Sequence, residues 1–211
     1  MPNILTFGDS NTHGTPPIVT RGLYARYDQA TRWPMRLARR LGPDWHLVEE
    51  GLPGRTAAFA DPVMGAHMNG QDGLKIALQS HGPLDLLTIM LGTNDVKSRF
   101  GASPERIVAG LASLVDIALG LEMAARHPGL RLLLICPPPV QERGVLAPEF
   151  QGGAAKAQAL APMLEAYAAQ RGVGFLDAGR VLSTSPTDGV HFEPQGHAAL
   201  ADAVAGALPE P

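Results

Sequence analysis

The chain has 211 residues, and its 17 Lys and Arg against 20 Asp and Glu give a formal net charge of −3. This length favours one domain, so residues 1–211 are expected to form a single unit. The weak acidic balance argues against nucleic-acid binding, and a single cysteine, Cys136, excludes an internal disulfide framework and a zinc site built on cysteines.

Short apolar runs alternate along the chain with longer amphipathic segments. Such alternation predicts an α/β fold, in which helices on both faces cover a parallel sheet and the site lies at the carboxyl ends of the strands. Pro162 predicts a kink or break in its helix. In chain order we expect strand 4–7, helix 33–41, strand 46–48, helix 71–81, strand 84–91, a helix from about 104 to 126 behind Ser103, strand 130–136, helix 154–171, strand 173–176, and helix 195–208 ending near Pro209.

Three long irregular segments, 11–31, 55–70 and 137–153, follow expected strands and should share one rim of the sheet. The apolar runs of the chain are far shorter than the roughly 20 residues that span a bilayer. The first residues have neither the basic region nor the long apolar region of a secretory signal peptide. We therefore expect a soluble, cytoplasmic protein without a membrane partner.

Three of these strands end in residues suited to acyl chemistry. Ser10, in Gly-Asp-Ser-Asn-Thr, would stand on a tight turn with its hydroxyl exposed near backbone N–H donors. Gly54 could direct its N–H at a ligand oxygen. The Asn94 amide, in Gly-Thr-Asn-Asp, could donate to an anionic oxygen. Each motif alone is also ordinary turn chemistry.

A fourth motif precedes the last helix, where Asp188 and His191 are three residues apart. The carboxylate can orient the imidazole and leave its other nitrogen free to act as a base. A surface Asp-x-x-His is the simpler alternative. A metal site is disfavoured because no third or fourth ligand stands at a suitable spacing.

The four motifs together supply a nucleophile, a base, an orienting carboxylate and oxyanion donors, which is a full inventory for acyl transfer. They resemble the four conserved blocks of the SGNH hydrolases, also called GDSL esterases and lipases. The resemblance implies a catalytic Ser10, His191 and Asp188. It also implies an oxyanion hole made by the N–H of Ser10, the N–H of Gly54 and the amide of Asn94. The resemblance further implies a three-layer αβα, flavodoxin-like fold whose sheet has the strand order 2-1-3-4-5, and a site with no metal and no cofactor.

A closer resemblance, through residues 49–56, 61–62, 69–70 and 84–95, is to the bacterial arylesterase/acyltransferase branch. It implies a small-molecule ester substrate: a short acyl ester of a phenol, an alcohol or an acetylated sugar. It also implies a homo-oligomer, and possible transfer of the acyl group to alcohols or peroxide. His13 stands where the best-known acyltransferase of this branch has tryptophan, so hydrolysis is expected to dominate. Loop residues suited to an interface or to shielding the pocket are Phe59, Met64, Met68, Val145 and Leu146.

Candidate substrate-binding residues are His13, Trp33 and Phe192. Core packing is the alternative role for both aromatic residues, Trp33 and Phe192. Arg55, beside Gly54, either braces the oxyanion loop through a salt bridge or is a solvated charge. The alternatives to a short-chain esterase are a thioesterase or lysophospholipase with the same blocks, a non-catalytic binding module, and a metal hydrolase.

Overall fold

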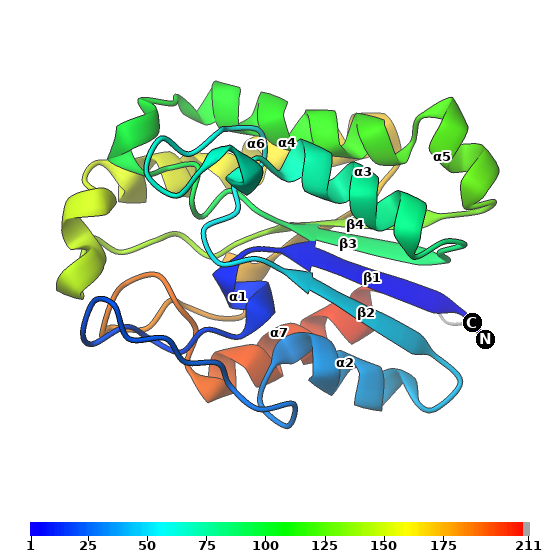
Figure 1. Ribbon diagram of the computed structural model, residues 1–211, viewed down its shortest axis with the longest axis horizontal. Coiled ribbons are helices and arrows are strands. Elements are labelled where there is room, and N and C mark those ends of the chain that lie inside the picture. The colour runs from blue at the N-terminus through cyan, green and yellow to red at the C-terminus, as the bar shows by residue number, and fades with distance from the viewer. Residues whose placement is uncertain (209–211) are drawn as a thin grey trace.

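Five parallel strands form the centre of the structure, a computed structural model that describes residues 1–208 (Figure 1). Their order is β2-β1-β3-β4-β5, so the predicted fold class and strand order are confirmed. The strands are β1 (Asn3–Gly8), β2 (His46–Gly51), β3 (Leu86–Met90), β4 (Arg131–Cys136) and β5 (Gly174–Asp177).

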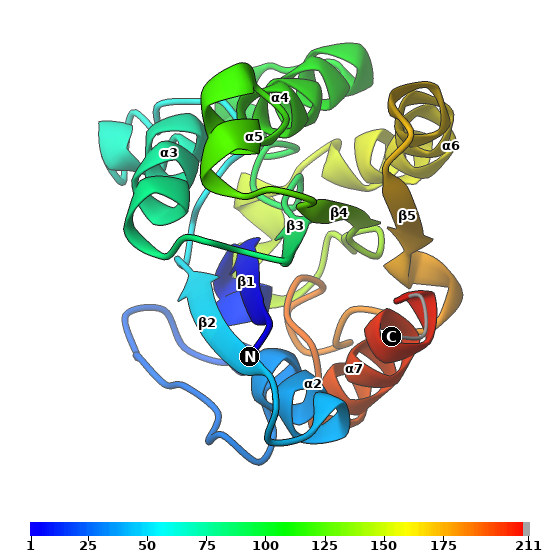
Figure 2. The same ribbon diagram turned by 90° about the vertical axis from the view of Figure 1, so that its right-hand side faces the viewer.

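Helices cover both faces of the sheet, which gives the three expected layers (Figure 2). Helices α3, α4, α5 and α6 lie on one face, and α2 and α7 lie on the other. The helices are α1 (Ser10–His13), α2 (Trp33–Leu41), α3 (Gly70–Ser80), α4 (Pro104–Ala118), α5 (Leu121–Arg126), α6 (Gly153–Arg171) and α7 (Pro194–Ala207). In residues 1–208 no helix combines the length and the apolar character that crossing a membrane requires.

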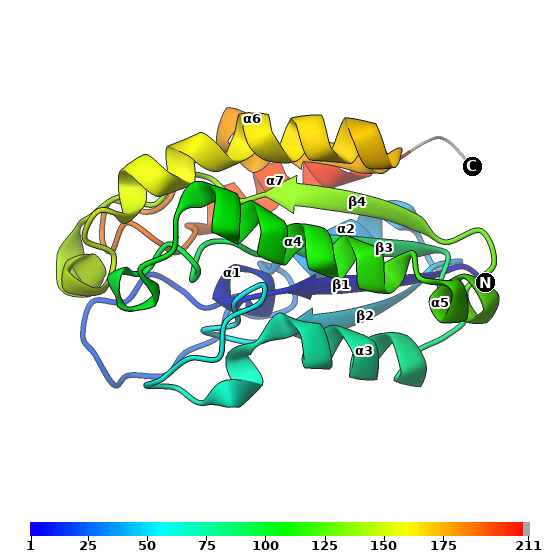
Figure 3. The same ribbon diagram turned by 90° about the horizontal axis from the view of Figure 1, so that it is seen from above.

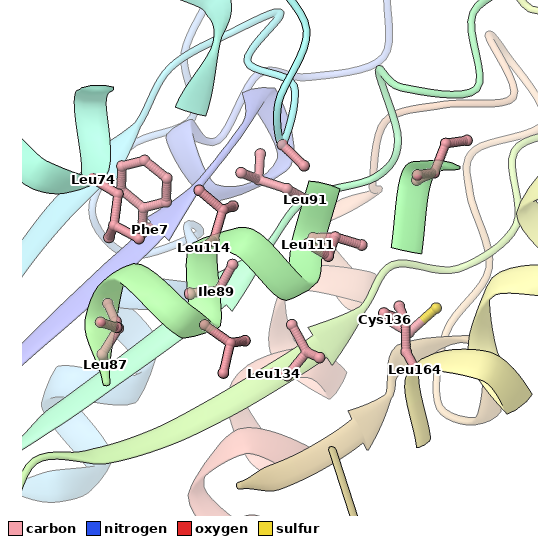
Figure 4. Packing of buried hydrophobic residues seen from close by; sticks show 14 of the residues in the cluster. Phe7, Leu74, Leu87, Ile89, Leu91, Leu111, Leu114, Leu134, Cys136 and Leu164 are labelled. Carbon is pink, nitrogen blue, oxygen red and sulfur yellow. The ribbon is translucent and has the colours of Figure 1, made fainter. Parts of the chain in front are cut away.

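Successive side chains of a strand enter opposite layers, because they alternate between the faces of a sheet. Phe7 and Ile89 pack with Leu111 in the cluster beneath α3, α4 and α6 (Figure 4). Ile4 and Met90 pack in the cluster beneath α2 and α7. Both faces of the central strands are thus buried, which explains why these strands are almost continuously apolar in sequence.

Two helix predictions need correction. The segment expected to be one helix up to Arg126 is divided into α4 and α5, because Gly120 has an extended backbone and begins the second helix. The expected break at Pro162 is absent, and α6 is continuous. Pro162 and Gln158, whose carbonyl loses its helical partner, are both exposed, so water can satisfy that carbonyl. Pro209 lies outside the described residues.

Strand register brings the candidate motifs to one edge. In β1, Gly8 pairs with Gly51 of β2 and with Met90 of β3, so the three central strands end level with one another. The irregular segments gather beyond these carboxyl ends, where the arrowheads point in Figure 3. Residues from all three segments line one pocket, which confirms that they share a rim.

Candidate active site

Ser10 stands at the start of α1, directly after β1. Asp9 caps this short helix by accepting the N–H of Asn11 at 2.9 Å, and so braces the turn. Gly8 is required for the tight turn, since a Cβ there would lie 2.1 Å from Thr12 Oγ1. The turn leaves Ser10 5% exposed.

His191 joins Ser10 to Asp188. Its Nε2 lies 3.0 Å from Ser10 Oγ, and its Nδ1 lies 2.6 Å from Asp188 Oδ2. With the imidazole proton on Nδ1, Nε2 is free to accept the proton of the serine hydroxyl. The structure therefore brings together three residues that the sequence separates by up to 181 positions.

Asp188 has no exposed surface, yet it is well supplied with donors. Besides the contact with the His191 ring, its oxygens accept the backbone N–H groups of Ile18, Val190 and His191 at 2.7, 2.9 and 3.0 Å. Burial favours the neutral acid, but the hydrogen bonds and charge of His191 and the backbone donors outweigh it, and they hold the Asp188 pKa below its usual value. The carboxylate stays charged and can stabilise an imidazolium.

The residues predicted to form the oxyanion hole, Ser10, Gly54 and Asn94, line one pocket. Gly54 has φ +92°, a conformation that favours glycine. The Asn94 amide donates to Arg55 O at 3.0 Å, which ties it to the Gly54 loop and leaves its second N–H free. Within residues 1–208, neither the Ser10 N–H nor the Gly54 N–H donates a hydrogen bond to another group of the chain.

Arg55 is a buried brace, and the solvated alternative is wrong. It is 6% exposed, its Nη1 donates to the carbonyls of Gly8 and Glu50, and its guanidinium lies 4.1 Å from the centre of the Phe7 ring. The predicted salt bridge is long, at 3.8 Å to Glu50. Arg55 thus connects the oxyanion loop to the ends of β1 and β2.

Asp95 holds the same loop from the β3 side. Its Oδ1 accepts the N–H of Ala57 at 2.8 Å, and its Oδ2 has no partner within residues 1–208. Burial, opposed only in part by such hydrogen bonds, raises the pKa of Asp95 to about 7. Burial also raises the pKa of Asp9 to about 6. Sequence reasoning did not identify Asp95 as a loop anchor, although its place beside Asn94 was a signal.

The site opens into a pocket of about 190 Å³. Ser10, Gly54, Asn94 and His191 all line it, together with two charged residues that sequence reasoning missed, Lys97 and Glu149. The other lining residues are Thr15, Ile18, Pro53, Met64, Leu146, Phe150 and Val190.

The predicted substrate-binding residues do not reach this pocket. Trp33 and Phe192 have no exposed surface and belong to the cluster beneath α2 and α7. Both contact His197 there: the backbone N–H of Trp33 donates to its Nδ1 at 3.3 Å, and the ring centres of Phe192 and His197 are 5.6 Å apart. His13 turns outward, with its Nε2 3.2 Å from the hydroxyl of Tyr24. The core-packing alternative is therefore correct for Trp33 and Phe192, and His13 does not line the pocket.

The family model of the GDSL-like lipases/acylhydrolases matches residues 6–199. The chain belongs to the GDSL-like lipase/acylhydrolase family. No curated protein gives a match. Within residues 1–208, no three His, Cys, Asp or Glu side chains group closely enough to hold a metal ion.

Solved structures similar to this chain include a carbohydrate acetylesterase and an aryl esterase. Est24, a carbohydrate acetylesterase from Sinorhizobium meliloti, is 37% identical with a TM-score of 0.92, over 98% of this chain and 97% of that one. The native aryl esterase of M. smegmatis is 37% identical with a TM-score of 0.91, over 99% and 100% of the two chains. Family and relatives together support a carboxylic ester hydrolase.

Proposed function

We propose that the protein is a serine esterase that hydrolyses short-chain acyl esters through an acyl-enzyme. The observation that carries this proposal is the chain of contacts from Ser10 through His191 to Asp188, at 3.0 and 2.6 Å, inside a pocket that Gly54 and Asn94 also line. A hydroxyl, a base and a buried carboxylate in this sequence suit nucleophilic attack on a carbonyl.

In the proposed reaction, Ser10 Oγ attacks the ester carbonyl while His191 Nε2 takes its proton. The carbonyl oxygen becomes an oxyanion, which the N–H groups of Ser10 and Gly54 and the free N–H of the Asn94 amide stabilise. His191 then protonates the leaving alcohol as the C–O bond breaks. A water molecule attacks the acyl-serine, gives its proton to His191, and releases the acid and free Ser10.

The pocket supports small acyl groups. Its volume of about 190 Å³ and its apolar residues, among them Ile18, Leu146 and Val190, suit a short aliphatic chain. The names of the similar enzymes, an aryl esterase and a carbohydrate acetylesterase, favour aryl, alkyl or acetylated-sugar esters. An acceptor alcohol or peroxide in place of water would give acyl transfer as a side activity.

Ser10→Ala tests the nucleophile, with 4-nitrophenyl acetate as substrate. We expect hydrolysis to fall to background while circular dichroism and the melting temperature stay close to wild type. Ser183→Ala, at an exposed serine outside the pocket, is the matched control. Wild-type turnover by Ser10→Ala would refute the mechanism. A profile of 4-nitrophenyl esters rising toward long chains would favour a thioesterase or lysophospholipase instead.

Asn94→Ala tests the oxyanion role. We expect kcat to fall about 10²–10³-fold with a smaller change in KM, because the donor acts mainly on the charge that develops in the transition state. A rise in KM at unchanged kcat would remove Asn94 from this role.

We also propose a homo-oligomer that uses the apolar rim. Val19, Leu23, Tyr24 and Val63 are each more than 70% exposed, and Met64, which lines the pocket, is 40% exposed. Large apolar side chains exposed beside a site are common at interfaces. Light scattering coupled to size exclusion should give a mass that is a multiple of 22.2 kDa, and a monomer at all concentrations would contradict the proposal.

A further inference from the structure

Lys97 is a cation inside the pocket that the proposed reaction does not use. It follows Asn94 in the turn after β3, where its N–H donates to Asn94 O at 3.1 Å. The residue is 6% exposed and lines the pocket together with Ser10 and His191. Its ammonium lies 5.4 Å from the centre of the Phe150 ring. A buried charge at this place needs a partner.

The carboxylate nearest to Lys97 is already bound by two arginines. Glu149 Oε2 lies 3.7 Å from Lys97 Nζ, which is beyond hydrogen-bond distance. Glu149 contacts Arg21 at 2.7 Å through Oε1 and Arg99 at 3.3 Å through Oε2. Lys97 therefore holds the weakest of the three contacts that Glu149 makes with cations.

The ammonium of Lys97 has three N–H donors, and none of them donates a hydrogen bond within residues 1–208. Burial first, and the charge of Arg99 second, lower the pKa of Lys97. The charge of Asp9 acts in the other direction and raises the pKa of Lys97. Asp9 does not line the pocket, and its Oδ1 accepts the N–H of Asn11. An acceptor that enters the pocket with the substrate would stabilise the ammonium.

We propose that Lys97 selects ester substrates that carry a carboxylate close to the scissile ester. This inference rests on the proposed esterase function and adds to it the charge of the preferred substrate. The carboxylate would accept hydrogen bonds from Lys97 Nζ, and Glu149 would keep its contacts with Arg21 and Arg99. A charge-assisted hydrogen bond of this kind is about twice as strong as a neutral one. Hydroxyl and carbonyl oxygens would gain less at the same place.

The experiment compares anionic and neutral esters in pairs. Monoethyl succinate against diethyl succinate places the charge on the acyl side. 4-Acetoxybenzoate against its methyl ester places it on the alcohol side. The measured quantity is the ratio of kcat/KM for the anionic ester to kcat/KM for its neutral partner. A general loss of activity in a variant cancels in this ratio.

The variants are Lys97→Met, which removes the charge but keeps the length of the side chain, and Lys97→Arg, which keeps a cation. Lys75→Met is the matched control, because Lys75 is exposed on α3 and lies outside the pocket lining. We expect the ratio to fall at least about tenfold in Lys97→Met for one of the two pairs, and to be restored in Lys97→Arg. It should stay at the wild-type value in Lys75→Met.

Three outcomes overturn the inference, and they can be told apart. If wild type hydrolyses the neutral esters and Lys97→Met leaves both ratios unchanged, Lys97 does not select charge, and the esterase proposal stands. If wild type hydrolyses none of the four esters, the proposed function fails and the inference fails with it. A ratio that falls equally in Lys75→Met would show a long-range effect of net charge rather than recognition, and would also overturn the inference.

Discussion

Two aspartates of the site, Asp188 and Asp95, have no exposed surface, yet their pKa values move in opposite directions. Asp188 accepts four hydrogen bonds, from His191 and three backbone N–H groups, and its pKa is lowered. Asp95 accepts the Ala57 N–H on one oxygen, its other oxygen has no partner in residues 1–208, and its pKa is raised to about 7. Burial raises the pKa of both carboxyls, but at Asp188 the hydrogen bonds and charge of His191, together with backbone donors, outweigh it, whereas at Asp95 the backbone donors alone do not.

The first prediction removes the charge from Asp188, the carboxyl that accepts four hydrogen bonds. Asp188→Asn should lower kcat about 10³–10⁴-fold, because the amide cannot stabilise the imidazolium of His191 and favours its wrong tautomer. Hydrolysis of 4-nitrophenyl acetate measures this. The control is Asp177→Asn, whose carboxylate accepts one N–H, that of Gly179, outside the pocket. A loss below tenfold in Asp188→Asn would show that the charge of Asp188 contributes little.

Much of the fold and part of the candidate site could be predicted from the sequence. The alternation of apolar and amphipathic runs predicted the layers of the fold. The four motifs, together with the family resemblance, indicated Ser10, Asp188 and His191. The structure brings these three residues together. These predictions succeed because strand ends of a parallel sheet meet at one edge whatever the details of packing.

Other features depend on side-chain direction or on contacts between distant loops. Phe192 follows His191 in sequence but faces the cluster beneath α2 and α7, and adjacency says nothing about that direction. Glu149 meets Arg21 from the segment after β1, and Lys97 and Arg99 from the turn after β3. No periodicity or spacing encodes such a meeting, so the charged lining of the pocket required the structure.

A second prediction concerns Asp95, whose carboxyl accepts the Ala57 N–H. Asp95→Ala should lower kcat about tenfold with little change in KM, because the Ala57 N–H loses its acceptor and the Gly54 loop loses an anchor. Asp95→Asn keeps an acceptor oxygen and should restore most of the activity. Equal losses in both variants would mean that the charge of Asp95, and not its hydrogen bond, matters.

The smallest expected effect is on stability. A carboxyl whose pKa is raised in the folded state binds more protons folded than unfolded, so stability falls as the pH rises from the usual value of 3.8 toward about 7. Asp95→Asn should therefore gain roughly 1–2 kcal/mol over wild type at pH 8 and almost nothing at pH 4. Urea unfolding at both pH values measures this. A gain that is the same at pH 4 and pH 8 would contradict the raised pKa.

The contribution of Asp188 to stability depends on pH in the opposite direction. Because its pKa is lowered in the folded state, its contribution to stability is present above 3.8 and is lost as the pH falls below that value. Comparing Asp188→Asn with wild type at pH 7 and pH 3 would sharpen the contrast: the variant should be the less stable protein at pH 7, and the difference should shrink at pH 3.

The donors that hold Asp188 come largely from the main chain. Ile18 and Val190 donate their N–H groups to its carboxylate, and both residues also line the pocket. Every residue type except proline has such an N–H. Substitutions at these two positions can therefore reshape the pocket without removing the N–H groups that hold the Asp188 carboxylate. Specificity and chemistry are thus separable here, and the pair is a natural place to diversify the enzyme by directed evolution.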